Sequence, residues 1–277
     1  MESGIPNHGT ALDGPLDNAW LKLEWATEHL KGLAADIEAF LESDENKIVA
    51  ERETDSRYTL RLKMGPVPTV RWGLTFGDAI HGLRGALDHA VWQMVLRDHG
   101  GPPESERDRN RIQFPIYNSP EAFEKATVLR YVSDGSRTIL KEAQPHPGGN
   151  FHPLQVIAAL SNDDKHRLLI PGMCAFNEGT YKFRISHNKS VASVSEPVST
   201  IYAEDPLEDG AVLGYMDVEV IGPNPEVHVE CEIPGFIAFT ARNGVILGLG
   251  SIGKLAEYVN FLVKRVDLLF QGFVPEP

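Results

Sequence analysis

One stretch of this chain, residues 76–92, concentrates the side chains that could do chemistry. Its sequence, FGDAIHGLRGALDHAVW, is predicted to be helical and carries five such groups: Asp78, His81, Arg84, Asp88 and His89. Most surface helices use Lys and Glu at their polar positions, whereas His and Asp transfer protons or bind metals near neutral pH. At about 100° per residue, the Asp and His side chains share one band opposite the apolar stripe. The arginine lies at the margin of that band, one turn from Asp88, where an ion pair is expected.

A second polar cluster, residues 162–167, lies further along the chain and reads NDDKHR. It provides four candidate supporting residues: Asp164, Lys165, His166 and Arg167. If this cluster folds beside His89, its cations supply the positive potential that an anionic substrate requires. Two alternatives involve no chemistry. The helix band is then a solvated face, or His81 and Asp88 bond to this cluster in a buried network that fixes the packing.

Hydrophobic periodicity predicts the elements that must position these clusters. Apolar residues recur at helical spacing in two long stretches. The first stripe comprises Leu16, Trp20, Leu23, Leu30, Ile37 and Leu41, and the second Phe76, Ile80, Leu83, Leu87, Val91 and Met94. The pattern predicts helices over 17–42, 75–97, 153–164 and 251–273, a β-hairpin over 46–64, and β-strands from 168 to 249 separated by turn residues. Ser251 is the expected cap of the last helix.

The order of these elements favours an α+β fold, because the long helices are interrupted by β segments and do not alternate with single strands. We expect a bundle of three to four long helices with an inserted antiparallel β-sheet or small sandwich. Residues 1–15 form a flexible tail. The bundle comprises residues 16–170, including the hairpin, together with 251–273, and the β region spans 171–250.

Composition excludes some classes of function. The net charge is −13, from 39 acidic and 26 basic residues, which argues against broad electrostatic capture of DNA or RNA. The two cysteines, Cys174 and Cys231, lie far apart in no metal-binding spacing, so a reducing cytoplasm is the expected compartment. No signal peptide or membrane span is predicted. Gly248, Gly250 and Gly253 match G-x-G-x-x-G but lack a βαβ context, so no nucleotide cofactor is expected.

The sequence RGALDH places Arg84 and His89 on one helix with four residues between them. This spacing resembles the R-x4-6-H motif of the HEPN superfamily, helical proteins that include ribonuclease toxins and defence effectors. Three stretches, ALDHAVWQ, FPIY and SNDDKHRLL, also resemble a pattern of bacterial and phage proteins, which implies no activity. The HEPN resemblance implies a metal-independent endoribonuclease. His89 would then be the general acid or base at the ribose 2′-hydroxyl, and Arg84 would stabilise the phosphorane.

The same resemblance implies a homodimer, because family members build the site across two copies, each of which contributes one Arg–His pair. Asp88 joins Arg84 and His89 in the expected catalytic set, RNA is the expected substrate, and no metal or cofactor is needed. The chain departs from the family in having Gly85 after the arginine, where a polar residue is usual, and in the added β region.

Two further functions remain open from the sequence. A metal-dependent hydrolase would draw on mixed ligands that suit Zn, Mn or Fe: Asp78, His81, Asp88, His89, Asp164 and His166. Their spacing follows no specific metal motif. A non-catalytic protein would instead bind a ligand or partner, and the His and Asp clusters would form a structural polar network.

Overall fold

The computed structural model describes residues 14–145, 152–165, 169, 171–175, 184–199, 207–230, 235–240 and 246–273. The fold is α+β, as the order of elements predicts. The chain divides into two compact units. The first comprises Met1–Leu33, Val70–Leu169 and Ala241–Pro277, and the second comprises Ala34–Thr69 and Ile170–Thr240. Every candidate site residue named above falls within the first unit.

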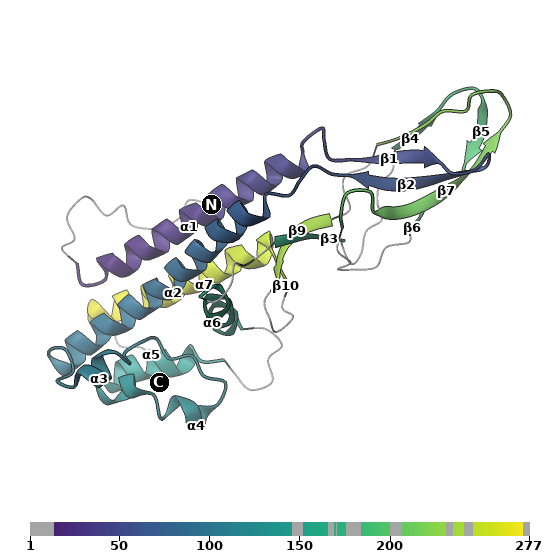
Figure 1. Ribbon diagram of the computed structural model, residues 1–277. Helices are drawn as coiled ribbons and strands as arrows, with labels where there is room; N and C mark the ends of the chain where they lie inside the picture. The colour runs from purple at the N-terminus through teal and green to yellow at the C-terminus, as the bar shows by residue number, and fades with distance from the viewer. Residues whose placement is uncertain are drawn as a thin grey trace. The chain divides into compact units, whose positions relative to one another are not determined.

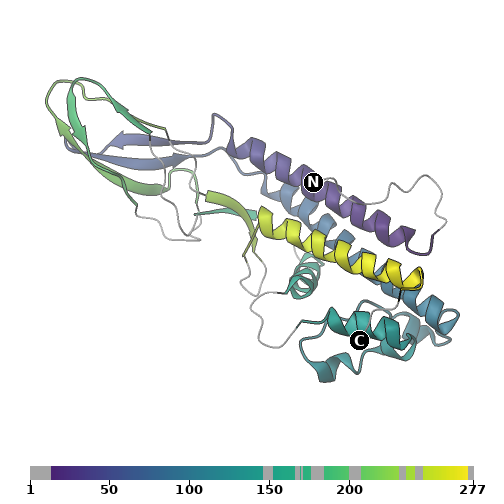
Figure 2. The ribbon, with the colours of Figure 1, turned by 180° about the vertical axis from the view of Figure 1, so that it is seen from behind.

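Where the structure describes it, the first unit is helical apart from one short strand. Its elements are most of α1 (Asp17–Leu41), α2 (Thr69–His99), α3 (Glu106–Arg109), α4 (Pro120–Phe123), the 3-10 helix η1 (Thr127–Arg130), α5 (Asp134–Glu142), α6 (Pro153–Asp164), β10 (Ile246–Gly248) and α7 (Leu249–Phe270). In both views α1, α2 and α7 run lengthwise beside one another (Figures 1 and 2). Helix α7 also contacts α5 and α6. The three long helices therefore form the body of this unit.

The apolar stripe predicted for the second long helix forms the centre of the core. All six of its residues are fully buried: Phe76, Ile80, Leu83, Leu87, Val91 and Met94. On α7, Leu255, Val259 and Val263 are buried in the same way. Burial of such side chains stabilises a fold by about 1.5–3 kcal/mol each, so α2 contributes heavily to the core.

Helices α1 and α2 approach closely at Gly82, which is buried. A methyl group built on Gly82 would lie 2.9 Å from the Cβ of Ala26 and 3.3 Å from the carbonyl oxygen of Lys22. The next glycine, Gly85, has room, because its nearest neighbour is the flexible Lys22 side chain at 3.6 Å. Gly82 therefore sets the spacing of the two helices, and Gly85 does not.

The carboxyl end of α2 is fixed by Asp98, whose side chain is only 4% exposed. It accepts hydrogen bonds from the Ser133 backbone N–H and hydroxyl at 2.9 Å and from the Ser136 hydroxyl, at the start of α5. Burial raises the pKa of this carboxyl, but the hydrogen bonds from Ser136, Ser133 and Arg97 outweigh it and lower the pKa below its ordinary value. Ionised Asp98 thus links the end of α2 to the beginning of α5.

The second unit is mainly antiparallel β-structure. Its strands are β1 (Lys47–Arg52), β2 (Arg57–Lys63), β3 (Pro171–Ala175), β4 (Arg184–His187), β5 (Val191–Val194), β6 (Val198–Ser199), β7 (Val212–Val220), β8 (Val227–Glu230) and β9 (Gly235–Thr240). The main sheet has the order β1-β2-β7-β5, and β6 also pairs with β7. Strands β4 and β8 pair, as do β3 and β9. Leu60, Leu62 and Met216 are buried on this sheet.

The structure differs from the sequence-based expectations at several boundaries. The predicted hairpin forms, but β2 pairs with β7, so the hairpin belongs to the β unit and not to the helical bundle. Helix α2 begins at Thr69, directly after Pro68, because Trp72 is buried in the added turn. Helix α7 begins at Leu249 with Gly248 as its N-cap, so Ser251 is not the cap. Residues 1–13 lie outside the described residues.

Among the described residues, no helix is both long enough and apolar enough to cross a membrane.

The two central glycines of α2 provide a matched test of helix spacing. Gly82→Ala is expected to lower the free energy of unfolding by about 1–3 kcal/mol, because its methyl group meets α1 backbone. Gly85→Ala is expected to raise it by about 0.5–1 kcal/mol, because alanine favours helix and the methyl group has space. Urea unfolding of both variants measures the difference. Equal effects would contradict the close approach at Gly82.

Candidate functional site

The two polar clusters of the sequence meet in the first unit, where α2 and α6 pack. Nε2 of His81 lies 3.1 Å from Oδ2 of Asp164, and its Nδ1 lies 3.5 Å from the Ser161 hydroxyl. The Asp164 carboxylate lies against Gly77, where a methyl group would come within 2.3 Å of Oδ1. Gly77 thus lets the Asp164 carboxylate approach the backbone of α2, and His81 and Asp164 join the two helices.

Arg84 and Asp88 together hold the backbone of Phe114. Nη2 of Arg84 donates to the Phe114 carbonyl at 2.9 Å, and Oδ1 of Asp88 accepts from the Phe114 N–H at 2.8 Å. The two side chains also bond to each other, since Nε of Arg84 lies 3.2 Å from Oδ2 of Asp88. The ion pair expected from their spacing therefore forms, and it binds both backbone groups of one residue.

Gln144 holds the backbone on either side of Ile116. Its Oε1 accepts from the Tyr117 N–H at 2.9 Å, and its Nε2 donates to the carbonyls of Pro115 at 2.9 Å and Leu140 at 2.7 Å. Side chains thus satisfy four backbone groups between Phe114 and Tyr117, which belong to no strand. We call residues 113–117 the clamped segment. Phe114 anchors it, with 1% of its surface exposed.

The remaining predicted residues are not brought together. His89 is half-buried and forms no hydrogen bond or ion pair with any described residue, and Asp78 is exposed. The band expected opposite the core is partly covered, because Gly77 lies against Asp164 and Gly82 against α1. His166 and Arg167 lie outside the described residues.

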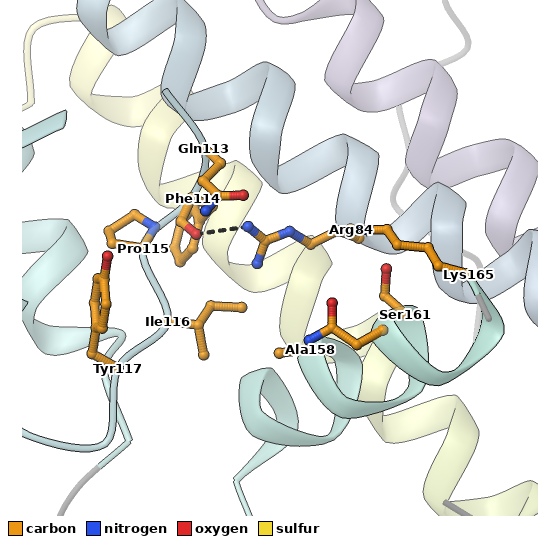
Figure 3. A pocket seen from close by; sticks show the side chains of 10 residues that line it. Arg84, Gln113, Phe114, Pro115, Ile116, Tyr117, Ala158, Ser161 and Lys165 are labelled. Atoms are coloured by element: carbon orange, nitrogen blue, oxygen red, sulfur yellow. Dashed lines mark hydrogen bonds between the residues drawn. The ribbon is translucent and has the colours of Figure 1, made fainter. Parts of the chain in front are cut away.

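A pocket of about 180 Å³ lies between α2, α6 and the clamped segment. Figure 3 shows Arg84 reaching from α2 toward Phe114. Ser161 of α6 and Lys165, the residue that follows this helix, lie across from residues 113–117. We call it the arginine–lysine pocket. It is lined by Arg84, residues 113–117, Ala158, Ser161, Asn162 and Lys165.

Among the described residues, the lining of this pocket contains two cations and no carboxylate. Lys165 forms no ion pair with any described residue. Asp88 lies behind Arg84 and balances its charge, so Lys165 provides the net positive charge of the pocket. Nη1 of Arg84 donates to none of the described residues, which leaves this N–H group for a ligand. The pocket is therefore suited to an anionic group.

Sequence reasoning missed the clamped segment and Gln144 as parts of the site. From the sequence alone, residues 112–117, IQFPIY, are predicted to be a short apolar extended piece. Gln144 begins a predicted loop over 144–152, which contains two Pro and two Gly. The available signal was an apolar, extended stretch with Pro115 and no pairing strand nearby in the sequence. Such a stretch needs side-chain partners for its backbone. Lys165, which would supply positive potential to His89 if the two clusters folded together, lines a pocket with Arg84.

No group of three His, Cys, Asp or Glu side chains in the described part of the chain is arranged to hold a metal ion. His81 and Asp164 are in contact, and two ligands do not define a structural or catalytic metal site.

The role of Asp88 in holding Phe114 can be tested by amide hydrogen exchange. Asp88→Ala is expected to speed exchange of the Phe114 amide at least about tenfold and to cost about 1–3 kcal/mol of stability, because a buried donor loses its acceptor. His89→Ala, one residue along, is the matched control and should leave this amide protected. Unchanged protection in Asp88→Ala would contradict the clamp.

In the comparisons, the chain matches no family model, no curated protein and no solved structure.

Proposed function

We propose that this protein binds a small anionic ligand, such as a phosphate ester, in the arginine–lysine pocket. The observation that carries the proposal is the part of the lining that the structure describes: Arg84 and Lys165 with no carboxylate, in a chain whose net charge is −13. In a chain with more acidic than basic residues, such a lining is a local departure from the average surface. In this proposal the polar contacts of α2 are structural. They position Arg84 and the clamped segment, and these groups hold the ligand.

The fixed position of Arg84 supports binding of an anion. Its guanidinium is held by Asp88 and by the Phe114 carbonyl, and its side chain is only 15% exposed. A guanidinium that is already ordered loses little conformational freedom when a ligand binds. Because Asp88 neutralises much of its charge, Arg84 acts mainly as a directional donor, and Lys165 supplies the Coulomb attraction.

The rest of the lining supplies neutral donors and an apolar wall. Gln113, Tyr117, Ser161 and Asn162 can each hydrogen-bond an oxygen of the ligand, and Ile116 and Ala158 provide apolar surface. The volume of about 180 Å³ is below the roughly 300–1,000 Å³ typical of pockets that enclose a whole ligand. The pocket thus has room for one phosphate-sized group.

Isothermal titration with inorganic phosphate and with a phosphate monoester tests this function. Wild-type protein is expected to bind both, with affinity that falls as salt rises. Lys165→Gln should weaken binding at least about tenfold, which corresponds to about 1.4 kcal/mol. Lys141→Gln, which removes an exposed lysine of α5 outside the pocket, should change affinity little. Absence of phosphate binding by folded wild-type protein would overturn the proposal.

A metal-independent ribonuclease is the second candidate function. One observation favours it: the half-buried imidazole of His89 forms no hydrogen bond or ion pair with a described residue, so it is free to transfer a proton. Arg84 and His89 are five positions apart on α2, which separates them by about 140° around the helix axis. The two groups could therefore act on one phosphodiester only if two copies of the chain complete the site.

The ribonuclease function predicts cleavage of single-stranded RNA in excess EDTA, with 2′,3′-cyclic phosphate ends, by a dimeric protein. His89→Ala should abolish cleavage and leave phosphate binding intact, because His89 is not in the pocket lining. Product ends are read by mass spectrometry, and the assembly by light scattering. A wild-type protein that binds phosphate but leaves RNA intact would reject this candidate.

A further inference from the structure

A second hollow lies on the other side of the clamped segment. It has a volume of about 320 Å³ and is bordered by Arg111, the segment itself and the 3-10 helix η1. Gln113, Pro115 and Tyr117 line both this hollow and the arginine–lysine pocket. The two spaces are therefore separated by the thickness of one extended chain. We call the second space the Arg111 hollow.

The Arg111 hollow has the same charge pattern as its neighbour. Of the lining residues that the structure describes, Arg111 is the one charged residue and none is a carboxylate. The nearby Asp108 is already bound, since it accepts from the Tyr131 hydroxyl at 2.7 Å and from Arg130 at 3.0 Å. Arg111 itself forms no ion pair with a described residue. Each side of the clamped segment thus presents a cation to solvent.

The ridge between the two spaces is rigid and carries an aromatic ring. The backbone on either side of Ile116 is fixed by Gln144, and that of Phe114 by Arg84 and Asp88. Tyr117 is half-buried and lines both spaces, and the described lining of each space also contains a cation. Tyrosine rings stack on nucleobases, whatever the base.

We infer that the two spaces bind one ligand in which two phosphates flank a single nucleoside, with the base against Tyr117, one phosphate at Arg84 and Lys165, and the other at Arg111. This inference rests on the proposed function, since it assigns the anion of the arginine–lysine pocket to one of the two phosphates. A nucleoside 3′,5′-bisphosphate has this chemistry, both as a free nucleotide and as the repeating unit of an RNA strand.

The test compares adenosine 3′,5′-bisphosphate with its isomer ADP, in which both phosphates are on the same side of the nucleoside. Wild-type protein is expected to bind the bisphosphate at least about tenfold more tightly than ADP or adenosine 5′-phosphate in isothermal titration. Arg111→Gln should remove that preference and leave affinity for inorganic phosphate unchanged. Arg107→Gln, an equal change of charge at an exposed position of α3 outside both spaces, should keep it.

Equal affinity for the two isomers, or loss of the preference in Arg107→Gln as well, would overturn the inference while phosphate binding still supports the proposed function. If wild-type protein fails to bind inorganic phosphate, the proposed function itself fails. A tetraribonucleotide separates the two sources of the ligand. An RNA strand is the source if it binds at least as tightly as the bisphosphate, and a free nucleotide is the source if it binds more weakly.

Discussion

An extended backbone that runs through a protein without joining a sheet needs side chains to satisfy its amide and carbonyl groups. Residues 113–117 are such a backbone, and the rest of the site depends on how they are held. Arg84 and Asp88 bind both polar groups of Phe114, and Gln144 binds Pro115 and Tyr117. Because these bonds come from α2 on one side and from the end of α5 on the other, the segment is rigid and leaves a space on each side.

This constraint gives a structural explanation for the arginine of the Arg–His spacing on α2. The arginine of the motif is bonded to Asp88 and Phe114, and these contacts account for its position without any reaction. His81 is likewise explained by its contact with Asp164. Among the described residues, neither His89 nor the exposed Asp78 has a polar contact. The same residue types that indicate proton transfer in a sequence are also those that satisfy buried backbone, and only their partners separate the two roles.

The long helices could be predicted from the sequence, because they depend on the periodicity of apolar residues. The contacts between residues far apart in the sequence could not. The stripe from Phe76 to Met94 identifies α2 because each apolar residue reports on the same helix face. No periodic signal links Asp88 to Phe114, which lie 26 positions apart, or Tyr117 to Gln144, which lie 27 apart. The hairpin was assigned to the helical bundle for the same reason, because the paired residues of β2 and β7 lie 151 to 160 positions apart. Candidate residues could therefore be identified, but their partners could not.

Net charge is a poor guide to a site of this size. A charge of −13 spread over the whole surface opposes the approach of a long polyanion, whose many phosphates must be neutralised together. At physiological salt, however, screening acts over about 8 Å, so one phosphate group responds mainly to the charges that touch it. In the two spaces beside the clamped segment, the charged residues of the described lining are Lys165, Arg84 and Arg111. Three carboxylates near these cations are already bonded: Asp88 to Arg84, Asp108 to Arg130, and Asp164 to His81. An acidic protein can thus hold a small anion wherever its acidic groups are bound to other partners.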